Sequence, residues 1–186
     1  NLYLNCKRKS MSYSFQTHYP SSAHEAASKA VTLYFANHTE VEALLLTGSC
    51  ARGKASIDSC LDFAVVIRPE VLAKKKFHFQ HHWEQFYSKD KVLKELRQAG
   101  RYSHIDIDFI DCVFKPSYHG YTTRADEFEV EIGNYLVYCE PLYEKGGYYQ
   151  AFKEQWLPYY EEKLRHERLE MVMGYLVNNL DHIPLF

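Results

Sequence analysis

The fold of this chain is decided by two neighbouring stretches, Gly48-Ser49-Cys50-Ala51-Arg52-Gly53 and Asp58-Ser59-Cys60-Leu61-Asp62-Phe63. The first follows an apolar run typical of a buried strand, and its leading glycine ends that run. A glycine lets the backbone approach a ligand closely, and a helix that begins there presents N–H groups to an anion. Because Ser49, Arg52 and Lys54 add a hydroxyl and two positive charges, this segment predicts a polyphosphate-binding loop.

Three carboxylates are expected on the strands that follow this loop. Asp62 interrupts the otherwise apolar run 61–67, where a carboxylate needs a partner, a metal ion or a cleft. Asp106 and Asp108 are two residues apart in the strand expected within 104–114, so they share one face of the sheet. Mg²⁺ prefers oxygen ligands and bridges protein carboxylates to substrate phosphates, so the pattern predicts a magnesium site beside the loop.

Together the two stretches resemble the signature of the nucleotidyltransferase (polymerase β-like) superfamily, in which Gly-Ser, a short spacer and Asp-x-Asp precede a later carboxylate. The minimal branch, with its kanamycin-type antibiotic nucleotidyltransferases and small antitoxin-type proteins, is the most similar. The resemblance covers about residues 22–114. It implies an α/β (α+β) fold, with a small mixed sheet flanked by helices and a C-terminal helical extension.

The resemblance also implies a role for each matching residue. Gly48 and Ser49 would hold the terminal phosphates of the nucleotide, and Asp62 would be a metal ligand. Asp108, or failing that Asp106, would be the third carboxylate, either completing the metal site or acting as a base towards the acceptor. The implied reaction is a Mg²⁺-dependent transfer of a nucleoside monophosphate from ATP or another NTP to a hydroxyl of a small molecule or a protein, releasing pyrophosphate.

Position 60 departs from the family pattern, because Cys60 stands where the first Asp of Asp-x-Asp is expected. Asp58 and Cys60 are the two candidates for the remaining metal ligand, although a thiol is a soft ligand that suits Mg²⁺ poorly. Three outcomes follow: Asp58 substitutes for the missing carboxylate, one metal ion is held by Asp62 and Asp108, or the domain binds nucleotide without turnover. The last outcome gives the alternative function, a catalytically degenerate nucleotide-binding or antitoxin-like interaction module.

Composition narrows the class of protein. The 186 residues carry a formal net charge of −2, which gives no global attraction to nucleic acid or anionic membranes and disfavours an RNA-directed transferase. The five cysteines are widely spaced, without a C-x-x-C pair, so reduced thiols in a cytoplasmic protein are expected. No apolar run approaches the ~20 residues of a membrane helix.

The expected organisation has three parts. Residues 1–20 are a leader or tag remnant, 21–143 the nucleotidyltransferase domain, and 144–186 the start of a helical domain that continues past Phe186. Within them, the periodicity predicts these elements: a helix over 22–37 with a capping box of Ser22 and Glu25, a strand over 41–47, a helix over 70–98 in one or two pieces, a short helix from 127 followed by a strand over 135–139, and a long helix from Tyr148.

Overall fold

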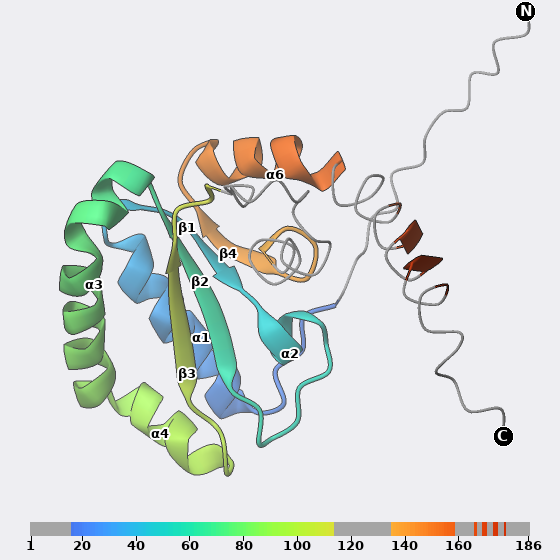
Figure 1. The fold of residues 1–186 in the computed structure, drawn as a ribbon. Coiled ribbons are helices and arrows are strands. Elements are labelled where there is room, and N and C mark those ends of the chain that lie inside the picture. Colours follow the sequence, from blue (N-terminus) through green and yellow to red (C-terminus); the bar gives the residue numbers. More distant parts are fainter. Residues whose placement is uncertain are drawn as a thin grey trace, which may run out of the picture.

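The computed structural model describes residues 16–113 and 135–158, with a few single residues between 166 and 177. Its described strands form a four-stranded mixed sheet in the order β3-β2-β1-β4 (Figure 1). β1 (Val41–Leu46) is antiparallel to β2 (Leu61–Ile67) and to β4 (Glu140–Glu144), whereas β2 and β3 (Ile105–Ile110) are parallel. The α/β class with a mixed sheet flanked by helices is confirmed, and it is consistent with a nucleotidyltransferase-like fold.

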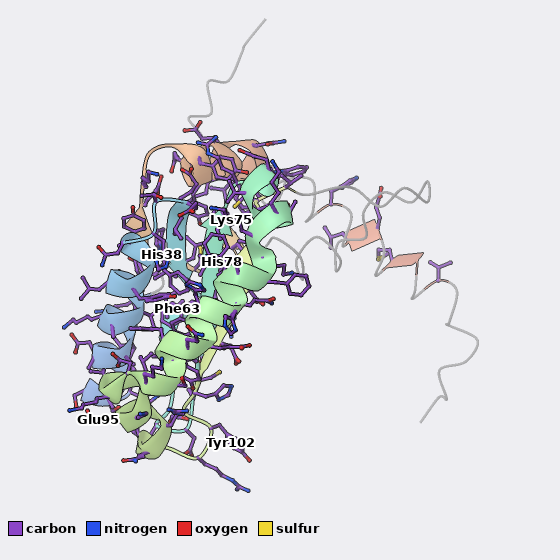
Figure 2. The ribbon with its side chains drawn as sticks, turned by 90° about the vertical axis from the view of Figure 1, so that its left-hand side faces the viewer. His38, Phe63, Lys75, His78, Glu95 and Tyr102 are labelled. Atoms are coloured by element: carbon purple, nitrogen blue, oxygen red, sulfur yellow. The ribbon has the colours of Figure 1, made fainter. Side chains whose placement is uncertain are left out.

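One face of the sheet is covered by three helices. These are α1 (Ser22–Ala36), α3 (Pro69–Lys89) and α4 (Lys91–Ala99), and Figure 2 shows Phe63 of β2 behind α3. Alternate strand residues face these helices, so the main core combines the following buried side chains: Val31 and Phe35 of α1, Leu44 and Leu46 of β1, Phe63 and Val65 of β2, Phe79 and Trp83 of α3, and Leu93 and Leu96 of α4.

The opposite face of the sheet has a smaller core. Residues 136 and 137 and the helix α6 (Tyr148–Pro158) pack there against the remaining alternate positions of β1 and β2. The side chains of Tyr149 and Phe152 from α6 are buried in this cluster together with Ala43 and Leu45. Helix α6 therefore forms part of the layer that covers this second face of the sheet.

Two boundaries differ from the predicted ones. The N-cap of α1 is Ser21, whose Oγ accepts a hydrogen bond from the backbone N of His24, so the capping box expected at Ser22 and Glu25 is wrong by one residue. The last strand lies at Glu140–Glu144 instead of 135–139. Its Pro141 and two glutamates give no alternating pattern, and a proline is tolerated there because β4 is the edge strand next to β1.

The other predicted elements are found close to their expected bounds. The helical segment expected over 70–98, in one or two pieces, is two helices, because Asp90 ends α3 and its side chain caps α4 by accepting from the N–H of Leu93. Residues 1–15, the helix expected from 127 and most of the chain after Pro158 lie outside the described residues. No helix among the described residues has both the length and the apolar character that crossing a membrane requires.

Candidate functional site

The turn between β1 and β2 is built around Gly48. Its φ is +65°, a left-handed conformation that side chains with a Cβ rarely adopt, and a Cβ there would overlap Asp62 Oδ2 and lie 2.8 Å from Asp62 Cγ. The backbone N–H of Thr47 also donates to the carbonyl oxygen of Asp62 at 2.8 Å. The glycine is therefore required because the Asp62 side chain occupies the space beside it.

The predicted phosphate-binding residues lie on and just after this turn. Gly48 begins the short helix α2 (Gly48–Ala51), as expected, and Ser49 in its first turn is half-buried. Arg52 ends the helix, and the exposed Lys54 follows, with its backbone N–H bonded to the carbonyl of Ser49 at 2.9 Å. One hydroxyl and two cationic side chains thus follow, along α2 and just after it, the glycine that contacts Asp62.

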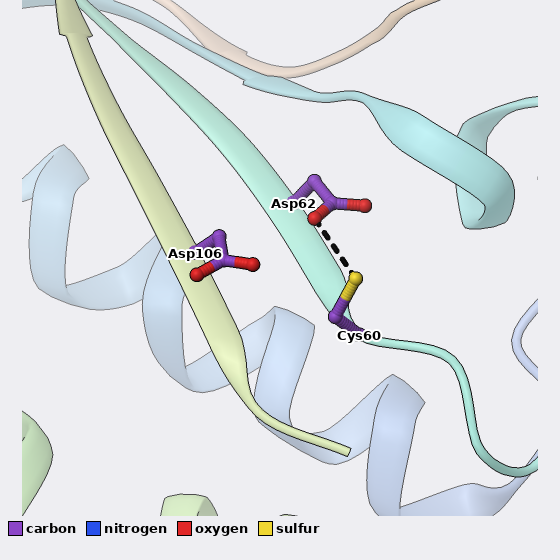
Figure 3. A group of neighbouring side chains, drawn as sticks. All are labelled: Cys60, Asp62 and Asp106. Atoms are coloured by element: carbon purple, nitrogen blue, oxygen red, sulfur yellow. Dashed lines mark hydrogen bonds between the residues drawn. The ribbon is translucent and has the colours of Figure 1, made fainter. Parts of the chain in front are cut away.

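The parallel pairing of β2 and β3 decides which late carboxylate meets Asp62. Asp62 is the register partner of Asp106, whereas Asp108 is opposite Ala64, one step further along the sheet. Ligand atoms of Cys60, Asp62 and Asp106 all lie within 4.8 Å of one another (Figure 3). Asp108 instead accepts a hydrogen bond from the Tyr135 hydroxyl at 3.3 Å. The structure therefore groups Asp106, the second choice from sequence, with Asp62.

Cys60 lies inside this group as a thiol. Its Sγ donates a hydrogen bond to Asp62 Oδ1 at 3.0 Å, drawn as the dashed line in Figure 3. Burial, and then the hydrogen bond and charge of Asp62, raise the pKa of the Cys60 thiol to about 12. Cys60 is consequently a neutral donor at neutral pH and adds no negative charge to the two carboxylates.

Asp58, the proposed substitute for the missing carboxylate, is engaged elsewhere. Its Oδ1 accepts from the backbone N–H of Arg101 at 2.8 Å. The neighbouring Ile57 carbonyl accepts from the Ser103 hydroxyl at 2.8 Å, and the Leu61 N–H donates to the His104 carbonyl at 2.9 Å. Asp58 thus helps to fasten the loop before β2 to the segment before β3, and it is not part of the cluster in Figure 3.

Two histidines that were not predicted as site residues lie against the cluster and the segment before it. His104 Nε2 contacts Asp106 Oδ2 at 2.9 Å, and its Nδ1 lies 2.6 Å from the Tyr102 carbonyl. His24 is fully buried, and its Nε2 donates to the carbonyl of Ser59 at 3.0 Å, next to Cys60. Sequence periodicity could have identified both. His104 precedes Asp106 by two residues and so lies on the same face of the sheet, and His24 falls on the buried side of α1.

Comparisons with known proteins add little to this geometry. No family model matches the chain, and no curated protein matches it. Among solved structures, the chain is similar to one titled "Crystal structure of the toxin-antitoxin with AMP-PNP", at 17% sequence identity and a TM-score of 0.38. The match covers 80% of this chain and 97% of the other. A likeness with so low a TM-score does not support a function, so the description of the site rests on the residues above alone.

Proposed function

We propose that this protein is a nucleotidyltransferase of the minimal, kanamycin-nucleotidyltransferase-like kind. It would transfer a nucleoside monophosphate from an NTP, ATP first among them, to a hydroxyl of a small-molecule or protein acceptor. The observation that carries the proposal is the pairing of Asp62 with Asp106 across two parallel strands, directly beside the Gly48 turn. These residues lie within 21–143, the range proposed as the nucleotidyltransferase domain. The cysteines among the described residues are free thiols, which fits a cytoplasmic location.

Asp62 and Asp106 fit a magnesium ion. Mg²⁺ is commonly held by one or two carboxylates, completing its coordination with water and substrate phosphates. Asp62 is half-buried and the side chain of Asp106 is 61% exposed, so the pair faces solvent from which a metal nucleotide can enter. Bound there, the ion would neutralise the charge of the reacting phosphates. Cys60 does not fit Mg²⁺ and is left out of this ligand set.

The remaining residues suit the two ends of the reaction. On one side of the carboxylates, the Gly48 turn, Ser49, Arg52 and Lys54 offer hydrogen bonds and positive charge to the nucleotide's phosphates. On the other side, Asp108 follows Asp106 on the same face of β3 and is oriented by Tyr135. We assign Asp108 the role of base towards the acceptor hydroxyl, since it lies beside the metal ligands without belonging to their cluster.

The test is Mg²⁺-dependent pyrophosphate release from each NTP in the presence of a panel of hydroxyl acceptors. Asp62→Asn and Asp106→Asn should abolish the release, because each removes one ligand charge. Glu95→Gln is the matched control, since Glu95 is exposed on α4 and the change removes the same charge away from the site. Equal release from the wild type and both aspartate variants would contradict the proposal.

Cys60 favours a second candidate, a module that binds nucleotide but has lost turnover. The first Asp of Asp-x-Asp normally adds a further carboxylate, and here the position holds a neutral thiol. Cys60→Asp separates the two candidates. If this variant releases pyrophosphate where the wild type binds nucleotide without releasing any, the degenerate module is the right description. Activity in the wild type that survives Cys60→Ser supports the transferase.

A further inference from the structure

The cluster in Figure 3 combines donor atoms of two chemical kinds. The thiol of Cys60 and the carboxylates of Asp62 and Asp106 each offer one ligand atom, and these atoms lie within 4.8 Å of one another. Within this group, Cys60 Sγ donates a hydrogen bond of 3.0 Å to Asp62 Oδ1. A single ion placed between these groups would have one sulfur and two oxygen ligands, an arrangement that magnesium sites avoid.

We propose that this cluster binds a thiophilic divalent ion of the zinc class, with Cys60, Asp62 and Asp106 as its three protein ligands. Zn²⁺ takes sulfur, nitrogen and oxygen donors, and three protein ligands with an open position are the usual set of a catalytic zinc site. Mg²⁺ gains nothing from the thiol, so Cys60 shifts the selectivity of the same two carboxylates towards softer ions. The proposal shares these carboxylates with the proposed function but needs neither nucleotide nor turnover.

Each ligand is held in place by a neighbouring group. Asp62 packs against the Gly48 backbone through Oδ2, which leaves Oδ1 turned to Cys60. Asp106 is contacted at Oδ2 by His104, an outer-shell pairing of the kind that orients metal ligands. We therefore assign the other carboxylate oxygen, Oδ1, to the ion.

The position of Cys60 is fixed from both sides along the backbone. The Ser59 carbonyl before it accepts from the buried His24, and the Leu61 N–H after it donates to the His104 carbonyl at 2.9 Å. The side chain itself is half-buried, beside the exposed Asp106. An ion can therefore reach the thiol without the sheet opening, and little rearrangement is needed to bind it.

Binding replaces the thiol's existing hydrogen bond. The S–H bond of Cys60 breaks, its proton passes to solvent or buffer, and the sulfur forms a bond to the metal ion. Asp62 Oδ1 loses the hydrogen bond that it accepted from this thiol and binds the same ion instead. One proton is released for each ion bound, and no electron is transferred.

Cadmium is a suitable probe, because a thiolate bound to Cd²⁺ gives a sulfur-to-metal charge-transfer absorption in the ultraviolet. The full chain, stripped of metal and reduced, is titrated with Cd²⁺ in the absence of nucleotide, and Zn²⁺ is then added as a competitor. We expect a band that saturates at one ion per chain and that Zn²⁺ abolishes. A hundredfold excess of Mg²⁺ should leave the band in place.

Three variants test the ligand assignment. Cys60→Ser should remove the band, and Asp62→Asn and Asp106→Asn should each weaken Cd²⁺ binding at least tenfold. Cys112→Ser is the matched control, a half-buried cysteine outside the cluster, and should keep the band. Circular dichroism of every variant checks that it is folded. A band that survives in folded Cys60→Ser, or no band in the wild type, would overturn the proposal.

The same experiment is independent of the proposed transferase. If Mg²⁺-dependent pyrophosphate release fails while the cadmium band behaves as expected, the zinc-class site stands and the transferase does not. If the band fails while transfer occurs, the reverse holds. Cys60→Asp links the two, because it should abolish the cadmium band and raise the affinity for Mg²⁺ by replacing the thiol with a carboxylate.

Discussion

Replacing Gly48 with alanine tests the contact between the turn after β1 and the side chain of Asp62. Gly48 has a φ of +65°, and for a residue with a Cβ this left-handed conformation costs about 1–2 kcal/mol. The new Cβ would also lie 2.8 Å from Asp62 Cγ and 3.1 Å from Asp62 Cβ. Asp62 must then leave its rotamer, and overpacking of this kind costs a further 1–3 kcal/mol or so.

Gly146→Ala is the matched control for this substitution. Gly146 has a φ of +81°, and nothing described lies within 4 Å of a Cβ built on it, so only the backbone cost applies. Urea unfolding followed by circular dichroism should show Gly48→Ala losing about 1–3 kcal/mol more stability than Gly146→Ala, the difference being the clash. In an Asp62→Ala background that difference should shrink, because the clashing carboxyl group is gone.

Two results would refute this reasoning. Equal losses for the two glycine variants would mean that Asp62 is not packed against the turn. A difference that persists undiminished in the Asp62→Ala background would mean that the clash involves another group. With the geometry as described, Gly48→Ala should also weaken Cd²⁺ binding, because the displaced carboxylate no longer faces Cys60.

Three further predictions concern reactivity and the two cores. Because the pKa of Cys60 is raised to about 12, its alkylation by iodoacetamide at pH 8 should be at least about a hundredfold slower than that of an exposed cysteine. The alkylation rate, followed by peptide mass spectrometry, should rise with pH and should be higher in the Asp62→Asn variant. Phe35→Ala should lower the free energy of unfolding by about 3–5 kcal/mol, whereas Leu33→Ala, on the exposed side of the same helix, should change it by less than about 0.5 kcal/mol. Tyr149→Phe should lower the free energy of unfolding by about 1 kcal/mol, because it removes the buried 2.6 Å hydrogen bond from the Tyr149 hydroxyl to the Tyr135 carbonyl. The loss is no larger because that carbonyl still accepts a hydrogen bond from the Cys139 thiol.

The strands that sequence alone located are those whose pattern follows from burial. β1 and β2 lie in the middle of the sheet with helices on one face and α6 on the other, so they appear as continuous apolar runs. β4 was misplaced because it pairs with the sheet through its backbone on one side only, and Glu140, Pro141 and Glu144 carry no strand pattern. The packing of α6 on the sheet's second face could not be predicted either, because helix periodicity does not show which surface the buried side chains of a helix, here Tyr149 and Phe152, will cover.

The residues of the candidate site also differ in how far the sequence alone predicts them. Asp62 could be predicted because a carboxylate inside an apolar strand is conspicuous, and Gly48 because a glycine ends the preceding strand. The choice between Asp106 and Asp108 could not, since both share one face of β3 and only the register of the parallel pair decides between them. That register is set by contacts distant in sequence, among them the Leu61 N–H to the His104 carbonyl and the Ser103 hydroxyl to the Ile57 carbonyl.

The register also gives Cys60 its significance. A slip of one residue would turn Asp106 to the face covered by α1, α3 and α4 and leave the thiol with a single carboxylate, too few ligands for the proposed ion. In the observed register the thiol meets both Asp62 and Asp106, and His104 is brought to the second carboxylate. Under the proposed function, Cys60 stands in the place of a metal-binding carboxylate, and its effect there is more than the loss of one negative charge. It places a sulfur donor where two oxygen donors already converge, so ion selectivity is the property that this residue should change most.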